Sequence, residues 1–160
     1  MKISSFLKSR YRYGFTLIEL LLVIGIIAIL ASIVIVAINP TKQLGEARNA
    51  QRRSDVNAVL QAVYQYAIDH NGQLPGNIPS SGTGTQICAS AVEPTTCTDT
   101  NNGVNLRALS GTYITDIPRD PQETDADWTG YFIVQDSNGR VTVAAPGAEG
   151  TPTPVISVTR

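Results

Sequence analysis

Residues 14–40 read GFTLIELLLVIGIIAILASIVIVAINP, and this stretch decides what kind of fold the chain can adopt. From Leu20 to Ile38 it contains nineteen residues, none of them charged, and Leu, Ile, Val and Ala dominate. A helix rises about 1.5 Å per residue, so this run would be about 28 Å long, close to the ~30 Å hydrocarbon core of a bilayer. The run therefore predicts a single membrane-spanning helix.

The segment before this run is strongly basic. Its first 14 residues carry +4, from Lys2, Lys8, Arg10 and Arg12, whereas the whole chain carries −1, which leaves −5 on the remainder. Basic flanks stay on the cytoplasmic side of a membrane, so the sequence predicts a cytoplasmic N-terminus and an exported C-terminal part. The mildly acidic remainder has no basic run, which argues against nucleic acid as a partner.

The basic segment meets the apolar run at Gly14-Phe15-Thr16-Leu17-Ile18-Glu19. This junction resembles the processing site of type IV prepilins and pseudopilins. The resemblance implies that a membrane-bound prepilin peptidase cuts after Gly14 and then N-methylates the new first residue, Phe15. A glycine at this position lets the backbone become extended in a protease cleft. Residues 1–14 would thus be a cleaved leader.

Glu19 is the acidic residue at the start of the predicted span. An ionisable side chain at the middle of a bilayer costs on the order of 2.5–3.5 kcal/mol, which makes it a candidate for function. One interpretation is that Glu19, only about 6 Å into the mature helix, simply reaches the cytoplasmic interface. The prepilin resemblance implies another, in which Glu19 pairs with the N-terminal amine of Phe15 in an adjacent subunit. Such pairing would fix the stagger between subunits, because a buried charge without a partner is strongly penalised.

Asn39-Pro40 closes the apolar run. Proline removes a helical hydrogen bond and clashes with the preceding turn, so we expect a kink or a melted turn near Val36–Pro40. The alternative is that Pro40 begins a separate helix, where proline is well tolerated. The span and filament-core helix is accordingly assigned to residues 15–40.

The pattern from Thr41 to His70 is amphipathic, and Asn71-Gly72 provides a helix stop. Helical spacing places apolar residues on one stripe, namely Val56, Val59, Leu60, Val63 and Ala67. We expect this stripe to pack against a head domain. Residues 41–72 are therefore assigned to an amphipathic helix of the head.

Residues 73–160 are assigned to a variable loop and a small β-sheet head. Gln73 to Asn105 is rich in Gly, Ser, Thr and Pro and predicts a long surface loop. A short helix or turn is expected at 106–113. The turn Asp136-Ser-Asn-Gly139 between residues 131–135 and 140–144 predicts a β-hairpin, and 154–159 can add a third strand.

The expected fold class is α+β: one long helix, apolar first and amphipathic second, packed on a small antiparallel sheet. Together with the phrase Ile117-Pro118-Arg119-Asp120-Pro121, this order resembles the lollipop-shaped subunits of type IV pili and the major pseudopilins. The resemblance is specific over residues 1–75 and architectural beyond them.

Cys88 and Cys97 enclose eight residues. If the head is exported, we expect them to form a disulfide, which for so short a loop adds roughly 2–3 kcal/mol. A shared metal ion is the weaker alternative, because a structural zinc site needs four ligands and the sequence clusters no others nearby.

In the major pseudopilins a loop in this region binds calcium, and Asp120, Asp125 and Asp127 are weak candidates for such a site. The alternative is that this Asp-rich turn is simply solvated. No other cofactor is expected.

The one histidine, His70, lies at an expected helix end. We expect it to complement the helix dipole and not to act as a base, so we expect no enzyme activity.

The sequence therefore favours a structural pilin, first held in membrane lipid and then polymerised with its own copies into an extracellular pilus. The implied partners are a prepilin peptidase, an inner-membrane platform protein and a cytoplasmic assembly ATPase. The alternative within the same mechanism is a pseudopilin of a type II secretion system, which builds a periplasmic filament. A competence pilin that takes up DNA, or a membrane-anchored binding module that never polymerises, has less support.

Overall fold

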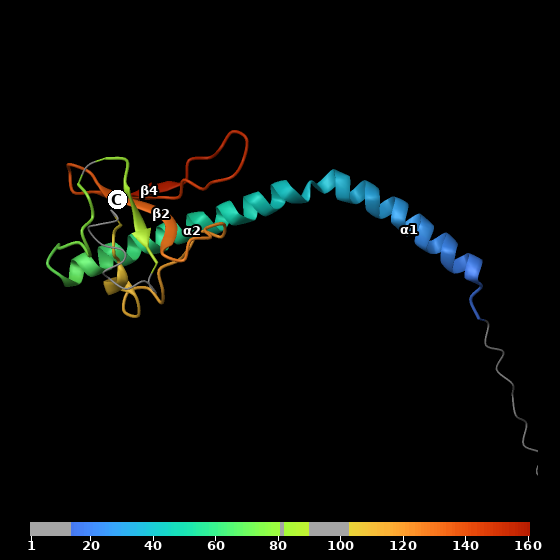
Figure 1. The fold of residues 1–160 in the computed structure, drawn as a ribbon, viewed down its shortest axis with the longest axis horizontal. Coiled ribbons are helices and arrows are strands. Elements are labelled where there is room, and N and C mark those ends of the chain that lie inside the picture. The colour runs from blue at the N-terminus through green and yellow to red at the C-terminus, as the bar shows by residue number, and fades with distance from the viewer. Residues whose placement is uncertain (1–13, 81, 90–102) are drawn as a thin grey trace, which may run out of the picture. The chain divides into compact units, whose positions relative to one another are not determined.

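A computed structural model describes residues 14–80, 82–89 and 103–160. The chain divides into two compact units, Met1–Pro40 and Thr41–Arg160. The lollipop outline of the whole chain stays a prediction. Figure 1 shows the elements in chain order.

The first unit contains helix α1, Leu17–Ile38, whose 22 residues span about 33 Å. It has no buried residue, and its side chains are apolar apart from those of Glu19 and Ser32. Among the described helices, it is the one that is long and apolar enough to cross a membrane. The predicted N-terminal apolar helix is therefore confirmed.

The helical path is interrupted at a single residue. Asn39 adopts a left-handed conformation with φ 42°, and helix α2, Pro40–Asp69, begins immediately after it. Proline is well suited to the first helical position, because its missing N–H would have no partner there. The change of direction across Asn39, and hence the predicted kink, stays a prediction.

Helix α2 ends with a left-handed turn. Asn71 and Gly72 both have positive φ, at 55° and 87°, and the N–H of Gly72 donates to the carbonyl of Ala67 at 2.7 Å. This six-to-one bond satisfies a carbonyl of the last turn, as in a Schellman motif. The helix thus ends where Asn71-Gly72 predicts.

The head contains a four-stranded antiparallel sheet with strand order β1-β2-β3-β4. Its strands are β1 Thr85–Cys88, β2 Trp128–Gln135, β3 Val141–Ala144 and β4 Ser157–Thr159. The predicted hairpin is β2–β3, and the predicted third strand is β4. The prediction of a continuous loop over 73–105 was wrong at 85–88, because these residues form β1 and pair with β2, Gln86 opposite Phe132. The expected short helix is the 3₁₀ turn Arg107–Leu109.

The core lies between α2 and the sheet (Figure 1). The predicted apolar stripe of α2 is buried as expected. It packs against inward-facing side chains of the sheet and its connections, namely Ile87, Leu106, Leu109, Tyr131, Ile133, Val141, Val143 and Ile156. Burying one aliphatic side chain contributes about 1.5–3 kcal/mol, so this α-on-β contact is the main stabilising element of the head.

Candidate processing and assembly site

The predicted cleavage junction lies just outside α1. Gly14, Phe15 and Thr16 precede the helix without regular secondary structure, and all three are exposed. Among the described residues, and apart from its chain neighbours, no atom comes within 4 Å of a Cβ placed on Gly14. The Gly14–Phe15 peptide bond is therefore accessible within this chain, as cutting by a peptidase requires.

Thr16 and Glu19 form a reciprocal cap at the start of α1. The Oε2 atom of Glu19 accepts hydrogen bonds from the backbone N–H of Thr16 at 2.8 Å and from its hydroxyl at 2.9 Å. The Thr16 hydroxyl accepts in turn from the N–H of Glu19 at 3.3 Å. This is a capping box, and it satisfies backbone donors that the first helical turn leaves without partners.

The capping role of Thr16 was not predicted, although Thr-x-x-Glu before an apolar run is the sequence signal for such a cap. The cap has a positional consequence for Glu19. Its carboxylate is turned back toward the start of the helix and is bonded to Thr16, the residue next to Phe15. Cleavage after Gly14 would create a new amine on Phe15, next to this acid.

Beyond Glu19 the surface of α1 is apolar apart from Ser32. The side chains of Leu20, Leu21 and Leu22 are each more than half exposed in the single chain, and successive residues point about 100° apart around a helix. A helix that is apolar on every side needs apolar surroundings on every side, from lipid or from other helices. The segment is thus equipped for membrane insertion and for lateral packing.

Comparison with known families agrees with this site. Residues 9–35 match the family described as the prokaryotic N-terminal methylation motif. No curated protein and no solved structure shows a match to this chain. The matched motif includes the cleavage junction, Glu19 and most of α1.

That motif is the signature of type IV prepilins and pseudopilins, which are structural, pilin-type proteins. The chain carries this signature at its N-terminus, and its α+β architecture is pilin-like. The resemblance noted from the junction is confirmed. The motif implies processing by a prepilin peptidase and assembly into pilus-type polymers.

The head holds a polar network that was not expected. Arg52 on α2 is completely buried, and its guanidinium makes two bonds to Asp120, from Nε to Oδ2 at 2.6 Å and from Nη2 to Oδ1 at 2.8 Å. Burial alone would raise the pKa of Asp120, but the hydrogen bonds from Arg52 and from the N–H of Gln122 outweigh it and lower that pKa.

Glu149 joins the same network from the loop between β3 and β4. Its carboxylate accepts from Nε and Nη2 of Arg48, both at 2.6 Å, and from Nη1 of Arg52 at 3.0 Å. The side chain of Asn49 pairs with both backbone groups of Glu149. The hydrogen bonds from Arg48 are the largest cause that lowers the pKa of Glu149, from 4.5 to about 2.

This network bears on the calcium candidates. Both carboxylate oxygens of Asp120 are bound by Arg52, while Asp125 accepts the N–H of Asp127 at 3.0 Å. Over the described ranges, no three His, Cys, Asp or Glu side chains gather in a way that would hold a metal ion. Calcium binding through these three residues stays an untested prediction.

Cys88 is the last residue of β1 and is buried. Cys97, its predicted partner, lies outside the described residues, so the disulfide stays a prediction.

His70 follows α2, stacks on Tyr66 with ring centroids 3.8 Å apart, and places Nδ1 2.9 Å from the Tyr66 carbonyl. This position at the carbonyl end of the helix fits the expected interaction with the helix dipole.

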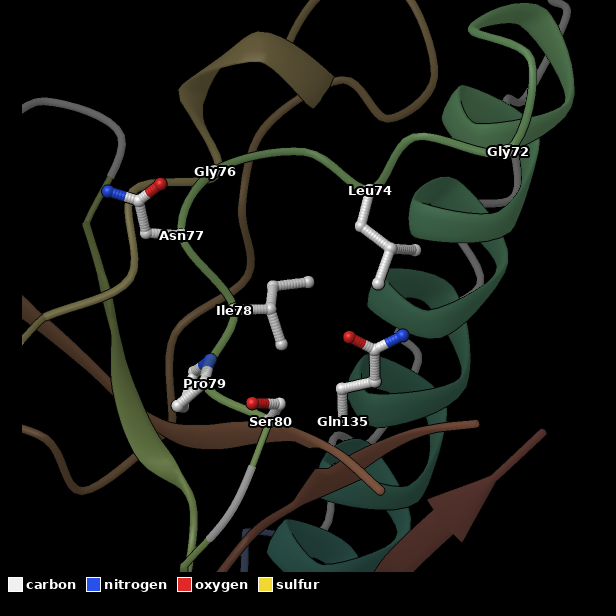
Figure 2. A pocket seen from close by; sticks show the side chains of 8 residues that line it. All are labelled: Gly72, Leu74, Gly76, Asn77, Ile78, Pro79, Ser80 and Gln135. Atoms are coloured by element: carbon white, nitrogen blue, oxygen red, sulfur yellow. The ribbon is translucent and has the colours of Figure 1, made fainter. Parts of the chain in front are cut away.

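The head also has an open cavity of about 560 Å³ beside the last turn of α2 (Figure 2). Leu74, Ile78 and Gln135 point into it. Its lining consists of Gly72, Leu74, Gly76, Asn77, Ile78, Pro79, Ser80 and Gln135. None of these side chains is charged, so this lining offers no general acid or base.

Proposed function

We propose that this chain is the pilin subunit of a type IV pilus, inserted in the membrane as a precursor, cut after Gly14 and polymerised through α1. The observation that carries the proposal is the position of Glu19. It is an acid four residues after the predicted new terminus, its carboxylate is bonded to Thr16 next to that terminus, and the helix is otherwise free of charge. A simple membrane anchor needs neither this acid nor the glycine junction.

Processing changes the electrostatics of the helix start. Removal of residues 1–14 takes away four basic residues and leaves an amine on Phe15. Inside a filament, Glu19 would be surrounded by apolar helices, where an ion without a partner is costly. Pairing with the amine of a neighbouring Phe15 removes that cost and selects one stagger between helices.

The apolar surface of α1 supports the exchange of lipid for neighbouring subunits. Lipid and packed helices are similarly apolar, so this exchange is close to neutral in hydrophobic free energy. Work from an assembly ATPase, transmitted by an inner-membrane platform protein, would then drive the subunit out of the bilayer. The head would lie on the exterior, because the basic leader keeps the N-terminus on the cytoplasmic side of the membrane.

The second candidate is a pseudopilin of a type II secretion system. The matched motif is common to both classes, so the same cleavage and the same use of Glu19 would apply. The two functions differ in where the filament ends: a pilus extends from the cell surface, whereas a pseudopilus stays in the periplasm.

Electron microscopy of fibres sheared from intact cells tests the proposal. We expect long fibres whose subunit begins at N-methylated Phe15 by mass spectrometry. Fibres absent from the surface, together with periplasmic polymers of the same processed subunit, would transfer the assignment to the pseudopilin. A processed chain that stays monomeric in lipid, with all assembly partners present, would contradict both.

A further inference from the structure

Helix α2 is attached to the head in two chemically different ways. From Val56 to Ala67 its buried residues are apolar and belong to the core. Before Val56 its buried residues are Gly45, Asn49, Arg52 and Asp55, none of which has an apolar side chain. The first part of α2 is therefore held by hydrogen bonds and ion pairs, not by hydrophobic packing.

Many of these bonds converge on one side chain of one loop. The loop runs between β3 and β4, and its base is closed by the N–H of Ala145 donating to the carbonyl of Ile156 at 2.8 Å. Within it, Glu149 reaches across to α2 and bonds to Arg48, Asn49 and Arg52. We call Glu149 and these three residues the α2 latch.

The latch recognises both the side chain and the backbone of Glu149. Its carboxylate takes a two-pronged bond from Arg48, and its N–H and carbonyl bind the two ends of the Asn49 side-chain amide. Gly45 lies beside this contact: a Cβ there would lie 3.6 Å from the Cβ of Glu149, an ordinary van der Waals distance. Charge-assisted, two-pronged bonds are strong but directional, so small displacements of the loop would break several together.

The geometry points to Glu149 as a releasable latch that holds residues 45–51 of α2 on the head. When the loop is withdrawn, these residues detach, while Arg52 stays bonded to Asp120, Asp55 stays bonded to Tyr131 and the apolar core around residues 56–67 stays folded. A stretch of helix without tertiary contacts opens more readily than a packed one, because most helical stability in proteins comes from packing. The detached part would therefore open and exchange its amide protons.

Such a latch would give the subunit a length of helix that can follow α1 when a filament is pulled. This use rests on the proposed function, whereas the latch itself does not. The inference is therefore tested on the unassembled chain, where failure of filament formation has no influence on the result.

Hydrogen–deuterium exchange of the full chain in detergent micelles provides the test. Three chains are compared: the wild type, Glu149→Gln and Glu46→Gln. The last is the matched control, since Glu46 lies on the same helix but is exposed and pairs only with Lys42 at 3.8 Å among the ion pairs described. In Glu149→Gln we expect amides of 45–51 to exchange about tenfold faster or more, equivalent to about 1.4 kcal/mol, and amides of 59–67 to keep the wild-type rate.

Arg48→Gln provides a second route to the same result, because it removes the partner without altering the loop. It should accelerate exchange in the same residues. The inference is overturned if 59–67 accelerates equally, if 45–51 keeps its rate in both latch variants, or if Glu46→Gln has the same effect. A Glu149→Gln chain that fails to fold would also overturn it, since the core is inferred to stand without the latch.

Discussion

The carboxylate of Glu19 accepts two hydrogen bonds from Thr16, one from its backbone N–H at 2.8 Å and one from its hydroxyl at 2.9 Å. Both bonds use Oε2. The carboxylate that is proposed to pair with a neighbouring subunit is therefore already hydrogen-bonded within its own chain. Thr16 therefore orients Glu19 before assembly. Capping and subunit pairing are separate uses of one carboxylate, and substitutions can separate them.

Glu19→Gln should remove the charge and keep the cap, because glutamine serves at the third position of a capping box. We expect this variant to insert and be cleaved, but to form few or no fibres by electron microscopy. Thr16→Val is the converse, as it loses the capping hydroxyl, costs about 1 kcal/mol of helix stability and keeps the acid. It should still assemble. Normal fibres from Glu19→Gln would remove the support for charge pairing.

Gly14→Val should block processing. The folded chain tolerates the change, since no atom lies within 4 Å of an added Cβ, so any effect reports on the peptidase. We expect the intact precursor mass after co-expression with a prepilin peptidase. Gly25→Ala is the matched control, because Gly25 is equally unobstructed and alanine favours a helix by about 1 kcal/mol. Equal cleavage of the two variants would contradict the assigned junction.

Much of the fold was predictable because its determinants are local in sequence. Helix α1, the stripe of α2 and the β2–β3 hairpin each follow from spacing within one short segment. Strand β1 was missed because its four residues have no pattern of their own and it pairs with a strand at least 40 positions away, for example Gln86 with Phe132.

The polar network of the head was missed for a related reason. Within α2, no acidic residue lies four positions from Arg48 or Arg52, so helical spacing offers these arginines no partner. The actual partners of Arg52 are Asp120 and Glu149, which are 68 and 97 residues further along the chain. Only the folded head brings those loops to the helix. The Thr16–Glu19 cap, by contrast, was readable from the sequence.

Cys88→Ala should lower head stability by roughly 2–3 kcal/mol if Cys88 is bonded to Cys97. Cys97→Ala should have a similar effect, and the double variant should be no worse than one single variant, because both remove the same bond. Chemical denaturation followed by Trp128 fluorescence measures the stability of the head, since Trp128 is the only tryptophan and is the first residue of β2. Alkylation of both thiols in the unreduced native protein would rule the bond out.

Acid should weaken the head through Glu149. The pKa of this group is lowered from 4.5 to about 2, chiefly by Arg48, so the unfolded chain takes up its proton at a higher pH than the folded chain. The stability that Glu149 supplies is complete above pH 4.5 and is lost as the pH falls toward 2. Urea midpoints at pH 7 and pH 3 should differ less in Glu149→Gln than in wild type. An equal difference, or one reduced as much by Glu46→Gln, would exclude this cause.

Arg52→Met tests the buried ion pair at the centre of the network. Arg52 is fully buried and Asp120 nearly so, and removing one member leaves the other charge without its partner. Such a loss costs about 3–5 kcal/mol, whereas replacing both members with uncharged residues is often close to neutral. We therefore expect Arg52→Met to be severely destabilising in urea, and Arg52→Met combined with Asp120→Asn to recover part of the loss. Asparagine keeps an oxygen for the N–H of Gln122, which Asp120 now accepts at 2.8 Å. If the double variant is as unstable as the sum of the two single variants, then Arg52 and Asp120 are not coupled, and packing of the arginine side chain alone explains its burial.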